Sequence, residues 1–238
     1  MSGAFKTEAV VLRSIRYGEA DRVLHLYSAD RGRLGAMAKG ARRLRSRLGG
    51  RLEPLMRVRL VLHEGRGELC TVTQVDTVHA HAALRERRSA LERATQACDA
   101  VLRLLDSGEP NHAAYNLLCN ELALLDADPA AATRAQALAF RLKLLLAAGF
   151  APELSSCAAC GEVEHLRGFS PAAGGVVCAG CEAGSFPLSG EAHEFLIAAL
   201  SRPLAQAPPA SERALGQADR AIAETLEHHA HVRLRRVA

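Results

Sequence analysis

Short runs of alternating apolar and polar residues fill the first third of the chain. Turn sequences rich in Gly and Asp separate them at residues 17–19, 30–32 and 64–67. Alternation with a period of two predicts strands with one solvated face. The five predicted strands lie at residues 7–16, 22–28, 33–38, 56–62 and 69–78. This number of strands favours a small closed barrel of the five-stranded oligonucleotide-binding (OB) type.

From about residue 82 the apolar residues recur every three or four positions, which is typical of amphipathic helices. The first helix ends before Pro110, and a second follows through residues 115–125. Asp128-Pro129 predicts the start of a third helix, with Asp as the cap and Pro in the first turn. Gly149 is expected to end this helix in a left-handed conformation.

Two more helices are expected near the end of the chain. Ser189 is a good cap for a helix that ends before Pro203, and residues 215–229 form a long amphipathic helix. We expect both to pack against the helices of residues 82–148. The fold class is therefore α+β, an N-terminal OB barrel followed by an α-helical domain. The predicted boundaries are 1–79 for the barrel and 80–238 for the helical domain.

Two cysteine pairs lie in a segment of small residues between the third and fourth helices. Cys157 and Cys160 form one C-x2-C pair, and Cys178 and Cys181 form a second after a gap of seventeen residues. This spacing predicts a four-cysteine zinc site. Redox-active thiols or an oxidised pair are the alternative, with no βαβ pattern to favour them, and His165 is a weaker substitute ligand.

Four protein ligands leave no open coordination position for a substrate, so we expect one structural zinc ion. It would hold together a metal lobe (residues 150–187) that is inserted into the helical domain and has few large apolar side chains. Reduced cysteines also indicate a cytoplasmic protein. No apolar stretch is long enough to span a membrane.

Positive charge is concentrated in the first third of the chain. Residues 1–78 hold 15 Lys and Arg against 8 Asp and Glu, a net charge of +7, within a total of +4. This asymmetry favours a polyanionic partner for the barrel.

Six cations follow the third strand within thirteen residues, in a segment that we call the basic loop (residues 39–51). They are Lys39, Arg42, Arg43, Arg45, Arg47 and Arg51. Such side chains can bind successive phosphates. The alternative is a solvated loop without a ligand, but the barrel context favours nucleic acid. Further arginines that could extend the surface are Arg13, Arg16, Arg31, Arg33, Arg57 and Arg59.

Aromatic residues are scarce in this part of the chain, so base stacking has few candidates. Phe5, Tyr17 and Tyr27 precede residue 115, and Tyr27 fits a core position better than a stacking platform. We therefore expect binding through backbone phosphates, with little sequence preference and a steep salt dependence. Phosphate-binding glycine loops, HExxH and the deaminase motif are absent from the sequence, which argues against an enzyme.

The order of these parts resembles that of the bacterial recombination mediator family RecO. The resemblance lies in residues 7–12, 18–21 and 37–43, and in the segment from Arg141 through Pro152 that leads to Cys157. It spans nearly the whole chain, and residues 38–43 and 150–160 are its most specific parts. The segment from about Gly216 departs from the family pattern.

This resemblance implies a non-catalytic DNA repair protein. RecO-like proteins bind single- and double-stranded DNA, anneal complementary strands and act with RecR to help load RecA onto strands covered by single-strand-binding protein. The acidic tail of single-strand-binding protein would then occupy a groove on the helical domain, and the chain would be cytoplasmic and nucleoid-associated, without a membrane or a small-molecule substrate.

Two other functions remain open at this point. The chain could be a protein-interaction adaptor with a structural zinc and only incidental DNA binding. It could also be a zinc-dependent nucleic-acid enzyme, which would need an open coordination position at the metal.

Overall fold

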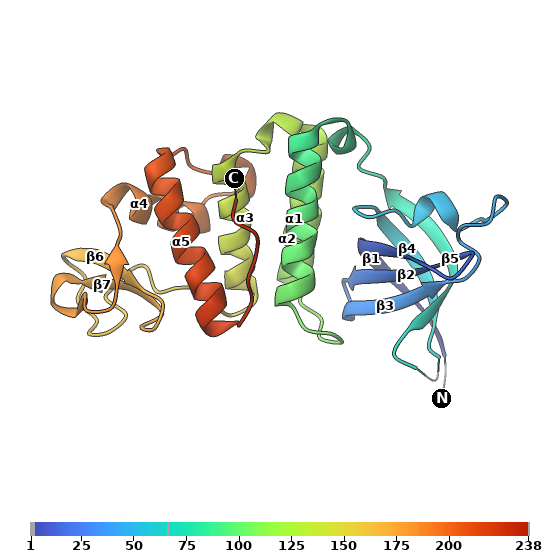
Figure 1. Ribbon diagram of the computed structural model, residues 1–238, viewed down its shortest axis with the longest axis horizontal. Coiled ribbons are helices and arrows are strands. Elements are labelled where there is room, and N and C mark those ends of the chain that lie inside the picture. The colour runs from blue at the N-terminus through green and yellow to red at the C-terminus, as the bar shows by residue number, and fades with distance from the viewer. Residues whose placement is uncertain (1–2, 66, 238) are drawn as a thin grey trace. The chain divides into compact units, whose positions relative to one another are not determined.

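The five predicted strands are present and close a barrel (Figure 1). The structure is a computed structural model that describes residues 3–65 and 67–237, so Arg66, in the predicted turn at 64–67, lies outside the described residues. The strands are β1 (Ala4–Tyr17), β2 (Asp21–Ser28), β3 (Gly32–Ala38), β4 (Arg57–His63) and β5 (Cys70–His79). Their order is β1-β2-β3-β5-β4, and the β3–β5 pair is parallel. This confirms the OB-type barrel.

A β-bulge in β1 decides which of its side chains face the barrel interior. The register with β2 shifts between Val11, a core residue, and Arg13. After the shift Ser14 lies opposite Leu24, another core residue, so the inward and outward positions of β1 are exchanged. The outward positions are then Arg13, Ile15 and Tyr17.

Two helices pack on the barrel in the same unit of the fold. They are α1 (Arg88–Leu104) and α2 (His112–Ala127), preceded by a 3-10 turn at Ala83–Glu86. Tyr27 of β2 is fully buried, and its ring lies 6.3 Å from that of Tyr115 in α2. Burial raises the pKa of Tyr27 to about 12. The prediction that Tyr27 belongs to the core is confirmed.

Three helices form the second unit, in which α4 (Gly190–Ser201) and α5 (Glu212–His229) both pack on α3 (Arg134–Ala147). Ser189 caps α4 and Gly149 follows α3 with a φ of 81°, as predicted. The predicted start of α3 at Asp128 is wrong. The amide of Asp128 closes α2 by donating to Leu124, and Thr133 caps α3 instead.

By packing, the chain divides into Met1–Pro129 and Ala130–Ala238. The sequence pattern divides it at residue 79, where strands give way to helices. The two divisions differ because α1 and α2 bury apolar side chains against the barrel. The boundaries 1–79 and 80–238, with the metal lobe at 150–187, stay a proposal.

The metal lobe contains a small sheet that the sequence pattern did not predict. Its strands are β6 (Leu166–Ser170), β7 (Gly175–Cys178) and β8 (Phe186–Pro187), in the order β7-β6-β8. These strands are too short for two-residue alternation to stand out among glycines. Within residues 3–65 and 67–237, no helix is long and apolar enough to cross a membrane.

Candidate nucleic-acid interface and metal centre

The basic loop is fixed at its base to the barrel. Gly40, with a φ of 65°, donates its amide to Asp21 Oδ1 at 2.7 Å, and the Arg42 amide donates to the Ala20 carbonyl at 2.8 Å. Ala41 and Leu52 are buried in the barrel core. These two residues anchor the loop at its ends, and the residues between them that face outward include Leu44, which is fully exposed.

All six cations predicted to bind DNA are exposed on this loop. In the described part of the chain, none of them lies within ion-pair distance of a carboxylate. Two of them contact backbone carbonyls: Arg42 Nη1 lies 3.1 Å from Gly18 O, and Arg51 Nη1 lies 3.2 Å from Val75 O. Each guanidinium has five donors, so most of their hydrogen-bonding capacity stays available for phosphate oxygens.

Most of the arginines expected to extend this surface are engaged elsewhere. Arg57 and Arg59 share the carboxylate of Glu8, and Arg31 pairs with Glu64 at 3.0 Å. Arg33 binds Ser107 Oγ and the carbonyl of Leu102 in the first unit. Arg13 and Arg16 are exposed and, within the described residues, have no carboxylate partner. Arg13 and Arg16 therefore add to the uncompensated positive charge of the basic loop.

The four predicted cysteine ligands come together in the metal lobe. Their sulfur atoms all lie within 4.8 Å of one another, and those of Cys160 and Cys178 are 3.7 Å apart. Sulfur atoms around a tetrahedral ion with bonds of about 2.3 Å are about 3.8 Å apart. A disulfide would need about 2.05 Å, and all seven cysteines are free. The four cysteines thus fit a tetrahedral metal ion, and His165 lies outside the group.

Two tight turns present these cysteines. Cys157 and Cys160 flank a turn completed by Gly161, with a φ of 80°, while Cys178 ends β7 and Cys181 ends a 3-10 turn. Backbone amides of Cys178, Ala159 and Cys160 point at the Cys157 sulfur and lower the pKa of this thiol to about 6.

The pKa values of two other thiols of the group, Cys181 and Cys160, are raised. Contact with the sulfur atoms of Cys160 and Cys178, and then of Cys157, raises the pKa of Cys181 to about 12. One thiolate is favoured, but several together require a compensating cation. A divalent ion at the centre supplies this charge.

Besides the cysteines, the lobe has a few buried apolar side chains: the rings of Phe169 and Phe186 lie 5.5 Å apart, and Val176 of β7 is buried. Its hydrophobic cluster consists of Cys157, Val177 and Cys178, with Leu166, Ala173 and Cys181 packed against it. A second contact ties the lobe to α5, where Arg220 lies 4.0 Å from the centre of the Phe186 ring. A core of this size indicates that a metal ion at the cysteines would stabilise the lobe.

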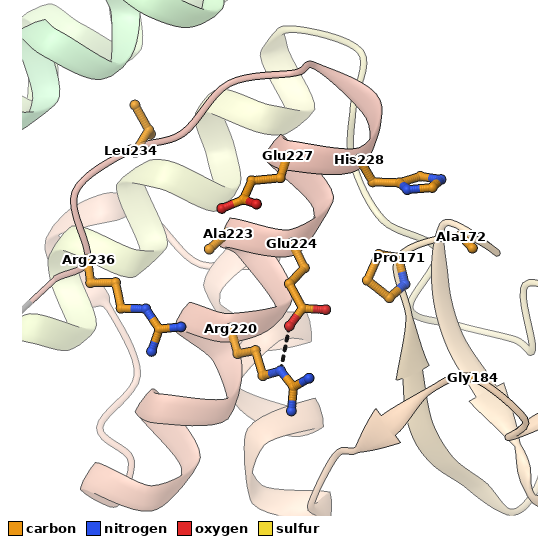
Figure 2. A pocket seen from close by; sticks show the side chains of 10 residues that line it. All are labelled: Pro171, Ala172, Gly184, Arg220, Ala223, Glu224, Glu227, His228, Leu234 and Arg236. Atoms are coloured by element: carbon orange, nitrogen blue, oxygen red, sulfur yellow. Dashed lines mark hydrogen bonds and ion pairs between the residues drawn. The ribbon is translucent and has the colours of Figure 1, made fainter.

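A pocket of about 630 Å³ lies beside α5 in the second unit (Figure 2). Arg236 and Leu234, from the segment after α5, lie on one side of this helix, and Pro171 and Ala172 lie on the other. Arg220 is paired with Glu224 at 2.5 Å. The segment after α5 is held in the second unit, because Arg141 of α3 donates to the Arg235 carbonyl and Val237 is buried.

Two apolar side chains lie on the outer face of β1: Ile15, which the sequence pattern did not single out, and Tyr17, which it placed in the turn after the strand. Ile15 and Tyr17 are 42% and 58% exposed, although an unbroken alternation from Val11 would place both inside the barrel. The bulge turns them outward. No feature of the sequence marks its position, so this exposed apolar face could not have been predicted.

Comparison with known proteins agrees with the resemblance read from the sequence. A family model described as "Recombination protein O N terminal" matches residues 1–81, and one described as "Recombination protein O C terminal" matches residues 85–237.

Several curated proteins named DNA repair protein RecO are also similar. The protein of Rubrobacter xylanophilus is 39% identical over 94% of this chain and 92% of its own length. That of Anaeromyxobacter sp. strain K is 37% identical over 94% and 91%. That of Cutibacterium acnes is 37% identical over 75% and 74%.

Proposed function

This chain belongs to the RecO family of DNA repair proteins, and on that premise we propose that it is a mediator of homologous recombination. In this proposal it binds single- and double-stranded DNA, anneals complementary strands, and acts with RecR to help load RecA onto DNA covered by single-strand-binding protein. It would work in the cytoplasm at the nucleoid, which a fluorescent fusion can test.

The observation that carries this proposal is the basic loop. Six exposed cations without carboxylate partners in the described chain stand on a loop anchored to an OB-type barrel. Guanidinium groups bind phosphate oxygens without reading base sequence. By neutralising phosphates on two strands, they would reduce the repulsion that opposes annealing. This role needs no catalytic group.

The ion in the metal lobe is proposed to be a single zinc. A four-thiolate tetrahedral set is typical of zinc or of iron–sulfur centres, and C-x2-C pairs with this gap favour zinc. Four protein ligands would leave no position for a reacting water. This arrangement supports a structural ion and a non-enzymatic protein.

The pocket beside α5 is our candidate site for the acidic tail of single-strand-binding protein. Glu224 and Glu227 line it, but they are paired with Arg220 and Arg233 respectively. Arg236 has no carboxylate partner among the described residues and can receive a terminal carboxylate. RecR is proposed as a partner from family membership, and no residue is assigned to it.

A labelled acidic peptide with a free C-terminal carboxylate tests this pocket by fluorescence anisotropy. Arg236→Ala should weaken binding about tenfold, because a charge-assisted hydrogen bond is lost. Arg213→Ala, an exposed arginine of α5 outside the pocket, is the matched control. Equal affinities for both variants and the original chain would place the tail elsewhere.

A mobility-shift titration at several salt concentrations tests the DNA interface. Replacing Arg42 and Arg43 with Ala should weaken binding to all DNA sequences alike. The slope of log K against log salt should become shallower by about 1.4 on single strands and about 1.8 on duplex, because two phosphate contacts are lost.

Arg87→Ala with Arg88→Ala is the matched control, since it removes the same charge from an exposed arginine pair in the same unit. If both double variants bind DNA like the original chain, the interface is not the basic loop. An adaptor with incidental DNA binding would then be the better description.

A further inference from the structure

An apolar strip is exposed on the outer face of the barrel, on β1, β2, β3 and the loop before β5. It consists of Ile15, Tyr17, Val23, Met37 and Leu69. Ile15, Tyr17 and Leu69 are 42%, 58% and 38% exposed, and Val23 and Met37 are partly exposed. Exposed apolar side chains are ordinary when they are scattered, but a contiguous group of them marks a binding surface.

The strand register makes this group contiguous. Ile15 lies opposite Val23, and Val23 lies opposite Met37, so the three form a row across adjacent strands. Directly opposed side chains on a sheet have Cβ atoms about 5 Å apart. Tyr17 lies two residues after Ile15 on the same face, and Leu69 lies against Gly35 two residues before Met37.

The strip ends where the basic loop begins. Gly18, the residue after Tyr17, accepts a hydrogen bond from Arg42, and Asp21, opposite Tyr17, accepts one from the Gly40 amide. Lys39 follows Met37 by two residues, and Arg13 lies on the same outer face beside Ile15. Cations without carboxylate partners in the described chain therefore lie at both ends of the strip.

We propose that the apolar strip stacks the unpaired bases of single-stranded DNA, with Tyr17 as its aromatic platform, while the basic loop binds the phosphates. This rests on the proposed function and adds a contact with bases to it. Bases in a duplex are stacked on one another and are not available to the strip. The strip therefore favours single strands over duplex, which phosphate contacts alone do not do.

Tyrosine fluorescence tests this contact directly. The chain has three tyrosines and no tryptophan, and Tyr27 and Tyr115 are buried. A thymine oligonucleotide stacked on Tyr17 should quench the emission of this exposed ring. Tyr17→Phe should abolish the quenching yet retain the affinity, because phenylalanine also stacks.

Affinity measurements supply the second readout. Tyr17→Ala should weaken binding of a thymine oligonucleotide between about fivefold and one hundredfold. The salt slope should be unchanged, and duplex affinity should change less than twofold. The Arg42 and Arg43 double variant should instead weaken both substrates and flatten the slope, so the two failures are distinguishable.

The stacking proposal is overturned if Tyr17→Ala leaves single-strand affinity unchanged or weakens duplex binding equally. The first result would favour a protein as the occupant of the strip, whatever the loop variants show. A thermal unfolding midpoint equal to that of the original chain confirms that Tyr17→Ala is folded. Met37→Ala, at a second position of the strip, should repeat the loss of single-strand affinity if the strip acts as one surface.

Discussion

Glu8 of β1 connects the barrel with the helices of the first unit. Its Oε1 accepts from Arg57 Nε at 2.6 Å and from the Tyr115 hydroxyl of α2 at 3.2 Å. Burial by itself raises the pKa of Glu8, but the hydrogen bond and charge of Arg57, together with Tyr115 and Arg59, outweigh burial and lower it. A single carboxylate therefore joins β1, β4 and α2.

Glu8→Gln should destabilise the chain by about 1 kcal/mol, because two arginines lose their carboxylate partner. The expected fall in the midpoint of thermal unfolding is about 2–4 °C. Since the folded state lowers the pKa of Glu8, its stabilisation is present above the ordinary value of 4.5 and is lost as pH falls through the lowered one.

The variant and the original chain should therefore converge in stability in acid. Glu19→Gln, an exposed position of the same barrel, should change the midpoint by less than the error at any pH. A difference for Glu8→Gln that persists unchanged below the lowered pKa would contradict the role assigned to this carboxylate.

Single residues could be predicted from the sequence where residue type or spacing defines their role. They could not be predicted where their role depends on the strand register or on a backbone hydrogen bond. The four cysteines were predicted from their spacing, and Ser189 was predicted as a cap because serine is a preferred residue ahead of a helix. Tyr17 was assigned to a turn, whereas β1 continues through it, and the bulge after Val11 sets the outward face on which it lies. The start of α3 was placed at Asp128 because nothing in the sequence shows that its amide completes α2.

At the scale of elements, the strands and helices follow from their periodicity, whereas the sheet of the metal lobe does not. Strands β7 and β8 are four and two residues long and include Gly175 and Pro187. Two-residue alternation cannot be recognised over so few positions. The lobe is instead organised by its cysteines, so its stability should depend on the ion.

Elemental analysis should find about one zinc per chain, and Cys160→Ser should lose it. The same variant, or a chelator, should open residues 150–187 to proteolysis. Cys98→Ala is the matched control, since burial raises the pKa of this helical thiol to about 12 and it lies outside the four-cysteine group. A metal-free chain whose lobe resists protease would contradict a structural ion.

At the scale of the whole molecule, charge and metal occupy different parts of the chain. The net charge of +7 belongs to residues 1–78, within the unit Met1–Pro129, and the metal lobe belongs to the unit Ala130–Ala238. The DNA-binding proposal therefore rests on the first unit, and the lobe variants should leave DNA affinity nearly unchanged. The sequence pattern predicted this separation, but not that α1 and α2 pack with the barrel.

The annealing of two complementary oligonucleotides, followed by fluorescence, tests the central claim most directly. The original chain should accelerate annealing at low salt, and the Arg42→Ala, Arg43→Ala variant should lose most of this acceleration. The Arg87→Ala, Arg88→Ala control should keep it. If the chain does not accelerate annealing, or if the loop variant anneals as fast as the control, the account of this protein as a mediator acting through its basic loop is contradicted.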